Sequence, residues 1–197
     1  MAAPTIQPGQ IKSGPGRILY APLGTTIPTF TAAASKITGT WTNWVEVGAT
    51  EEGLTYTEST DTSDITVAES LYPVRTVTTG KSSRIAFTMS HVSDLNWKLA
   101  MNGGTITTSG TGATKLNVYV PPLVGQEIRV MLGFLSLDED EVLIWPQVFN
   151  VGSVETGRGS FDAKHGLPVE FAAELPDPAV MTTPYKRWTS SGLAQGV

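Results

Sequence analysis

Ser90, His91 and Asp94 place a hydroxyl, an imidazole and a carboxylate within a short stretch of the chain. These are the groups of a nucleophilic triad, in which histidine takes the proton of serine and an acid orients the histidine. Closeness in sequence does not provide that geometry, because the three side chains must converge in space. His91 also follows a strand-like pattern and precedes a helix cap, so we expect a surface or capping histidine. With His165 the only other histidine, we predict no catalytic site and no cofactor.

Two groups of neighbouring carboxylates are the other candidates for chemistry. Acids fill residues 138–141, at a predicted hairpin turn, and Glu51 adjoins Glu52. Acid–base catalysis needs two acids in unlike environments, whereas adjacent acids at a polar turn should be equally solvated. Asp61 and Asp64, or the 138–141 turn, offer oxygen ligands to a hard cation, but neither fits the twelve-residue calcium loop. We predict no metal site, with a cation at an acidic turn as the alternative.

The charges between residues 37 and 84 are segregated by sign. Residues 37–74 contain seven acids and no lysine or arginine, and three bases follow directly. Such a stretch repels itself, so it should be extended and favour a partner of opposite sign, most simply the basic flank of a second copy. We therefore predict a long hairpin or extended loop at residues 51–75, an inter-subunit loop that is mobile in the free subunit and ordered against a neighbour. The expected contact residues are Glu51, Glu52, Glu58, Asp61, Asp64, Glu69, Arg75, Lys81 and Arg84.

The composition narrows the function further. Charged residues make up only 16% of the chain, against about 25% in an average protein, which suits a surface largely used in subunit contacts. The net charge of −5 disfavours a general nucleic-acid binder, because phosphate contact needs a basic face. There is no cysteine, and the first residues lack the pattern of a signal peptide. No stretch approaches the length of a membrane span, so we expect assembly in a cytoplasm, without a membrane.

The elements that position these residues are mostly strands. Residues 84–90 have the clearest period of two, with Ile85, Phe87 and Met89 on one face. A helix is predicted over residues 94–101, capped by Ser93 or Asp94, and a turn-rich loop over residues 107–114. Eight or so strands and one helix predict an all-β fold, a β-sandwich or barrel. The other strands are predicted at residues 17–22, 41–48, 54–58, 63–67, 116–120, 127–137, 142–151, 153–156 and 168–174.

Proline and glycine residues are frequent at both ends of the chain. They predict an N-terminal arm over residues 1–16 and a C-terminal arm over residues 176–197. A single domain over residues 17–175 lies between them.

Five tryptophans leave a binding function open. A carbohydrate-binding domain displays a row of aromatic rings, but Trp41 and Trp44 would point to opposite faces of one strand. Core and interface packing is therefore the expected use of the tryptophans. A non-enzymatic β-sandwich binding module, either a phage accessory or a carbohydrate-binding domain, is the alternative function.

Several stretches resemble one family. The sequence GRILYAP at residues 16–22 is similar to the opening strand of the major tail protein, or tail tube protein, of long, non-contractile-tailed phages, especially those of actinobacteria. WVEVGATEEGL at residues 44–54 resembles the second strand of that family and the entry to its long loop. The order of strand, helix and large hairpin matches as well, as does DPA at residues 177–179.

The resemblance implies a structural virion protein. In that family a β-sandwich or barrel protomer with one helix forms hexameric rings, which stack into the tail tube. The tube encloses the tape-measure protein, meets terminator and tip proteins, and later passes DNA without binding it specifically. The long loop of the family reaches a neighbouring ring or subunit, and it corresponds to residues 51–75 here.

Overall fold

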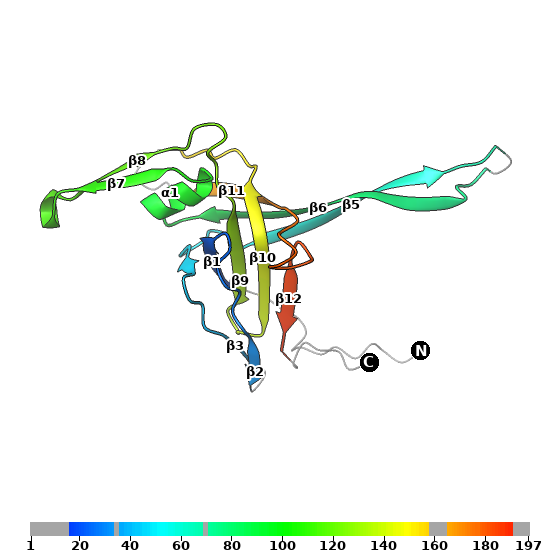
Figure 1. The fold of residues 1–197 in the computed structure, drawn as a ribbon, viewed down its shortest axis with the longest axis horizontal. Coiled ribbons are helices and arrows are strands. Elements are labelled where there is room, and N and C mark those ends of the chain that lie inside the picture. The colour runs from blue at the N-terminus through cyan, green and yellow to red at the C-terminus, as the bar shows by residue number, and fades with distance from the viewer. Residues whose placement is uncertain (1–15, 34–35, 69–70, 158–164, 191–197) are drawn as a thin grey trace.

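Antiparallel strands dominate the chain. A computed structural model describes residues 16–33, 36–68, 71–157 and 165–190. The largest sheet has the strand order β4-β1-β9-β10-β11-β6-β5, with β12 added beside β10 (Figure 1). Two small sheets, β2-β3 and β7-β8, accompany it. The all-β prediction with one short α-helix is confirmed. The strands are β1 (Gly16–Pro22), β2 (Thr31–Ala33), β3 (Lys36–Thr38), β4 (Val45–Glu46), β5 (Thr55–Ile65), β6 (Arg75–Met89), β7 (Thr105–Ser109), β8 (Leu116–Val120), β9 (Val130–Ser136), β10 (Glu141–Asn150), β11 (Leu167–Ala173) and β12 (Lys186–Thr189), and the helix is α1 (Asp94–Ala100).

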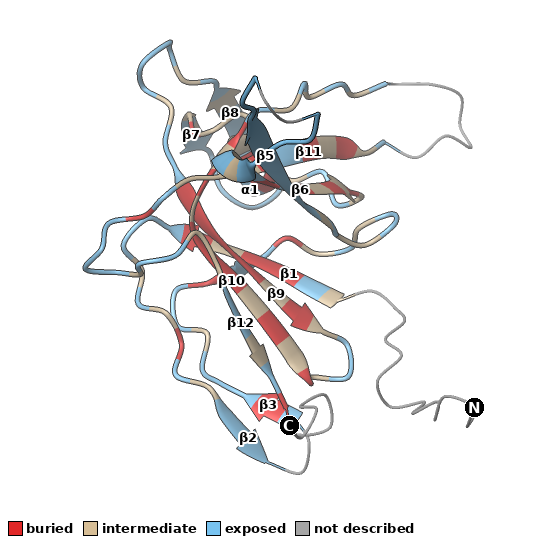
Figure 2. Cartoon of the chain, turned by 90° about the vertical axis from the view of Figure 1, so that its right-hand side faces the viewer, coloured by how far each residue is buried: buried red, intermediate tan, exposed pale blue. Residues whose placement is uncertain are grey.

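The large sheet is buried on both faces near its centre (Figure 2). Successive residues of a strand point to opposite faces, and in β1 Ile18 joins one hydrophobic cluster while Leu19 joins the other. The first cluster unites β1, β9 and β10 with β6, β11 and α1, and Trp145 is fully buried in it. The second cluster packs beneath the β2-β3 segment. The two clusters together hold the sheet as a rigid framework.

Strand β10 changes partners along its length. Its first half pairs with β12 and its last residues pair with β11, with a register shift between Trp145 and Val148. Pro146 lies at this shift and has no N–H to donate, which is why proline suits an irregular point in a strand. The break allows β11, β6 and β5 to run across β9 and β10 (Figure 1).

Helix α1 begins where the sequence indicated. Ser93 is its N-cap, and its side chain accepts a hydrogen bond of 3.2 Å from the backbone N–H of Asn96. The buried Asn96 side chain donates to the carbonyls of Val47, at 2.9 Å, and His91, at 2.5 Å. The helix is therefore fixed to the sheet at its first turn.

Three local predictions were wrong. Residues 41–48 are not one strand: Asn43 has a left-handed φ of 63°, and only Val45–Glu46 pairs, so Trp41 and Trp44 pack against each other with ring centroids 5.2 Å apart. Of the loop expected at residues 107–114, residues 107–109 are instead the end of β7, whereas residues 110–114 form the turn toward β8. Residues 153–156 form no strand, although they lie among the described residues.

The two ends of the described chain lie close together on the sheet. Gly16 pairs with Ser136 at the end of β9, and Thr189 pairs with Glu141 at the start of β10. Both therefore lie beside the turn that joins β9 to β10. The sequence did not indicate β12, which falls within the expected C-terminal arm and is hydrogen-bonded to β10. The expected N-terminal arm lies outside the described residues, except for Gly16.

Candidate assembly surface

The triad candidates do not come together. His91 is exposed and its backbone carbonyl accepts from Asn96, while the Asp94 carboxylate accepts a hydrogen bond of 2.8 Å from the Asn117 side chain. No hydrogen bond joins Ser90, His91 and Asp94 within the described part of the chain. His165 lies against the backbone carbonyl of Gly157. In the part of the chain that the structure describes, neither histidine is hydrogen-bonded to a serine or threonine hydroxyl.

The carboxylates at residues 138–141 are separated by their contacts. Asp140 is buried and accepts a hydrogen bond of 2.8 Å from the Ser136 hydroxyl, whereas Glu139 pairs with Lys36 at 3.2 Å. Glu141 pairs with Arg187 of β12 at 2.5 Å. Over the described ranges, no three Asp, Glu or His side chains converge as cation ligands would. The acids of this turn bind neighbouring strands of the same chain.

The tryptophans do not form an exposed row. Trp44 and Trp145 are buried, and Trp41, Trp97 and Trp188 are half-buried. Phe30 lies between Trp41 and Trp188, with ring centroids 5.4 and 5.0 Å away. These rings close the second hydrophobic cluster, as aromatic residues commonly do in cores.

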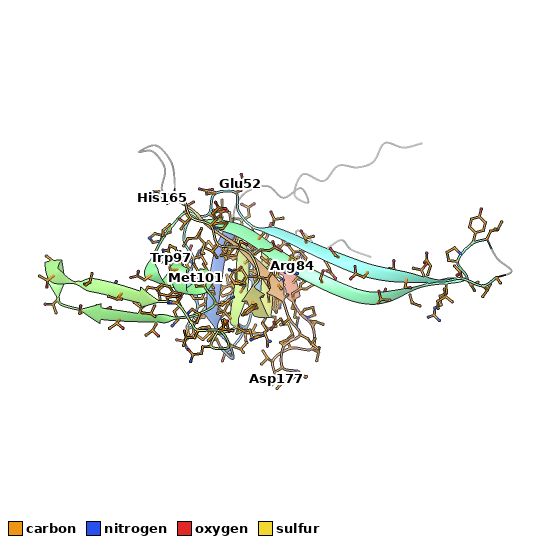
Figure 3. The ribbon with its side chains drawn as sticks, turned by 90° about the horizontal axis from the view of Figure 1, so that it is seen from above. Glu52, Arg84, Trp97, Met101, His165 and Asp177 are labelled. Atoms are coloured by element: carbon orange, nitrogen blue, oxygen red, sulfur yellow. The ribbon has the colours of Figure 1, made fainter. Side chains whose placement is uncertain are left out.

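The largest surface feature is the hairpin of β5 and β6, which we call the long arm. It extends far beyond the large sheet (Figures 1 and 3). Its base packs on the core through Tyr56, whose ring lies 5.6 Å from that of Trp145. Burial is the main cause that raises the pKa of the Tyr56 hydroxyl above its usual range. From residue 58 to residue 82, none of the described residues is buried.

The long arm is a hairpin, which is one of the two forms, a long hairpin or an extended loop, that the weak strand pattern indicated. Strand β5 pairs with β6 from Thr55↔Ala86 to Ile65↔Arg75, with one irregularity after Asp61. Threonine and serine fill much of this pairing, and the β-branched threonine suits extended backbone. The Thr76 hydroxyl donates a hydrogen bond of 2.6 Å to Asp64 across the strands. Cross-strand pairing thus gives the acidic segment its shape.

The expected contact residues divide between the base and the outer part of the long arm. Arg84 lies at the base of the arm (Figure 3) and pairs with Glu170 of β11 at 3.7 Å. Glu58 accepts hydrogen bonds from Tyr56 and Tyr185. Glu51 and Glu52 precede β5 and are exposed. The outer residues are Asp61, Asp64, Arg75 and Lys81, all exposed and without an ion pair to any described residue. Glu69 lies outside the described residues.

The end of the long arm is apolar, a feature that the charge pattern of the sequence did not indicate. The apolar side chains there are exposed, and Leu71 is completely so. A cluster of apolar residues around Pro73, formed by Leu71, Tyr72 and Val74, was the signal available in the sequence. We call these residues the arm tip: Ile65, Val67, Leu71, Tyr72 and Val74.

A second hairpin, β7-β8, extends from the other side of the molecule (Figure 1). It follows α1 directly, and Tyr119 of β8 donates a hydrogen bond of 2.9 Å to the Gly103 carbonyl. Asn117 of β8 donates to Asp94 of α1 at 2.8 Å. These contacts fix one face of the hairpin against the helix.

The comparisons with known proteins agree with the sequence resemblance. The model of a family described as phage tail tube protein matches residues 7–176. No curated protein matches the chain significantly. None of the helices in the described ranges is long and apolar enough to cross a membrane.

Proposed function

Because the chain belongs to the phage tail tube protein family, we propose that it is a non-enzymatic virion protein whose copies form hexameric rings. The rings stack into a tail tube that conducts DNA out of the virion. The subunits assemble in the host cytoplasm. The actinobacteriophage type of tail is part of this proposal.

The observation that carries the proposal is the long arm. A hairpin of this length, in which none of the described residues from 58 to 82 is buried, gains little free energy from its own chain, because hairpins depend on packing for stability. Contact with neighbouring copies would bury that surface. An oligomer built by repetition also multiplies weak contacts.

Four charged residues of the outer arm are proposed as inter-subunit contacts. Asp61, Asp64, Arg75 and Lys81 are exposed, and a neighbour presenting the opposite sign would pair with them. Each exposed pair contributes only about 0–1 kcal/mol, so repetition around a ring must supply the total. Arg84 and Glu58 already have partners within the chain and would contribute by holding the base of the arm. Glu51, Glu52 and Glu69 complete the proposed set.

The remaining partners follow from the family resemblance. The tape-measure protein would fill the tube during assembly, and terminator and tip proteins would close its ends. The net charge of −5 suits a conduit, because acidic walls repel DNA phosphates and do not retain them.

Removal of the outer arm tests the proposal. Asp61 and Gly80 are paired residues, so residues 62–79 can be replaced by Asn-Gly, a sequence that favours a two-residue hairpin turn. We expect the full chain to form rings or tubes in electron micrographs and in sedimentation. The shortened chain should stay monomeric with its near-ultraviolet circular dichroism retained. A full chain that remains monomeric at every protein and salt concentration would refute the proposed function.

A further inference from the structure

Exposed apolar side chains gather at two places on opposite sides of the molecule, and we propose that they bind each other between copies. The arm tip of one subunit would dock on the outward face of β7-β8 of a second copy. This inference rests on the proposed function, because it requires self-assembly. It goes further by assigning the surface that receives the long arm.

The receiving face consists of alternate residues of β8. Leu116, Val118 and Val120 are 60%, 47% and 54% exposed, and their spacing places them on one side of the strand. Their cross-strand neighbours in β7 are small polar residues, Ser109, Thr107 and Thr105. The result is a flat stripe of three apolar side chains bordered by hydroxyl groups. We call this stripe the receiving face.

The opposite side of β8 shows that the stripe is not turned toward the core of its own chain. Asn117 and Tyr119 alternate with the apolar residues and bond to Asp94 and to the Gly103 carbonyl. The two sides of β8 therefore have different uses, one fixed to α1 and its following turn and the other open. A hairpin held in this way presents its free side in one orientation, which lowers the entropic cost of binding.

The arm tip supplies an occupant of matching chemistry. Leu71 and Tyr72 are 100% and 79% exposed, and Ile65, Val67 and Val74 lie near them in the hairpin. Large aromatic and aliphatic side chains of this kind are the usual anchors of protein interfaces. Their burial against a second apolar stripe would remove both patches from water.

Geometry favours contact between the tip of one copy and the receiving face of another, and the charges permit it. Within one chain the two hairpins extend in opposite directions from the large sheet (Figures 1 and 3). The outer part of the long arm carries two acids, Asp61 and Asp64, beside two bases, Arg75 and Lys81, whereas β7-β8 carries Lys115 and no acid over residues 105–120. When the arm tip of one copy binds the receiving face of a second, the pair still has one unoccupied receiving face and one unoccupied arm tip. Further copies can therefore add at both ends, and the assembly grows into a chain or closes into a ring.

Chemical cross-linking tests the inference directly, because the chain contains no cysteine. Leu71→Cys and Leu116→Cys variants are prepared separately, mixed under assembly conditions and treated with a short bismaleimide. We expect a covalent dimer in the mixture and little in either variant alone. Leu175→Cys is the matched control for Leu116→Cys, since Leu175 is 72% exposed and follows β11. It should give little cross-linking with Leu71→Cys.

A charge substitution gives a second measurement on the same face. Leu116→Asp should raise the subunit concentration needed for half-maximal assembly by about tenfold or more, because it places a charge in an apolar contact. Leu175→Asp should change that concentration less than about twofold, and neither variant should lose its fold, because both residues are exposed.

The possible failures are distinguishable. Wild-type subunits could assemble while the mixed cysteine variants do not cross-link, or while Leu71→Cys alone cross-links equally well. In either case the assignment of the receiving face is wrong and the proposed function stands. Assembly unaffected by Leu116→Asp would have the same meaning. If wild-type subunits never assemble, both the proposed function and this inference fail.

Discussion

Asn150 joins three parts of the fold, and its removal should be costly. Its side chain is buried at the end of β10 and donates a hydrogen bond of 2.5 Å to the Ala100 carbonyl at the end of α1. The side-chain oxygen accepts from the N–H groups of Gly152, at 3.2 Å, and Glu170, at 3.0 Å. We predict that Asn150→Ala lowers the free energy of unfolding substantially and loosens the helix that precedes β7-β8.

The magnitude follows from the groups left without partners. The Gly152 N–H keeps its bond to the Glu170 carbonyl, so two backbone groups lose their partner, the Ala100 carbonyl and the Glu170 N–H. An unsatisfied buried group costs about 1–3 kcal/mol. The Ala100 carbonyl is buried, whereas the Glu170 N–H is only partly buried, so water can reach it and its cost lies at the lower end. We expect a loss of about 3 kcal/mol. With a denaturant slope of about 2 kcal/mol/M, the urea midpoint falls by about 1.5 M.

Urea unfolding of the unassembled subunit, followed by tryptophan fluorescence, measures this loss. Asn117→Ala is the matched control, because Asn117 also bonds through its side chain but is exposed; its cost should stay below about 0.5 kcal/mol. The backbone bonds of Asn150 to the Asn102 side chain, at 2.8 and 2.7 Å, remain in the variant. If Asn150→Ala costs no more than Asn117→Ala, the argument from buried partners is wrong.

Three further predictions concern the framework. Ser93→Ala removes the cap of α1 and should cost about 1 kcal/mol in urea unfolding, whereas Ser93→Thr should largely keep it. Phe171→Ala opens a cavity in the first cluster, where Phe171 is fully buried, and should cost about 3–5 kcal/mol; a cost near 1 kcal/mol would show that the core collapses around the gap. Hydrogen bonding to Arg17 lowers the pKa of Glu46 in the folded protein. The pair therefore stabilises the fold at pH values above about 4.3, the pKa of glutamate in an unfolded chain. This stabilisation is lost as the pH falls through the lower pKa of Glu46 in the folded protein. Glu46→Gln should therefore cost up to about 1 kcal/mol at pH 7 and nothing at pH 2, and a difference that persists in acid would contradict this account.

The strands and the helix of the framework were predictable where a short-range sequence pattern, such as alternation or a helix cap, determines the structure of a segment. Alternation in residues 84–90 indicated the inner half of β6, and Ile85, Phe87 and Met89 are buried as expected. Ser93 gave the start of α1. The strand predicted at residues 41–48 was wrong because Asn43, whose backbone is left-handed, interrupts a segment with strand-like composition. Short-range patterns do not reveal such a break.

The arms were only partly predictable. An extended backbone was expected over residues 51–75 and is present in Thr55–Ile65. The pairing of this strand depends on the continuation of β6 beyond its buried half, where polar residues leave no alternation to detect. Strand β7 was missed because its threonines, serine and neighbouring glycines resemble a loop. The receiving face depends on which side of β8 meets α1, and that is set by Asn117 and Tyr119 across the fold.

The shared position of Gly16 and Thr189 has a practical consequence. Both residues lie beside the same turn, because β1 begins there and β12 ends there. A fluorescent protein joined directly before Gly16 or directly after Ser190 would therefore occupy the same region around each subunit. Two labels on one chain, one at each of these positions, would compete for that space. Particles assembled from two kinds of subunit, each carrying one of the labels, would show both labels at the same location. Insertion of a marker in the turn after β7, on the far side of the molecule, would give an independent reference point.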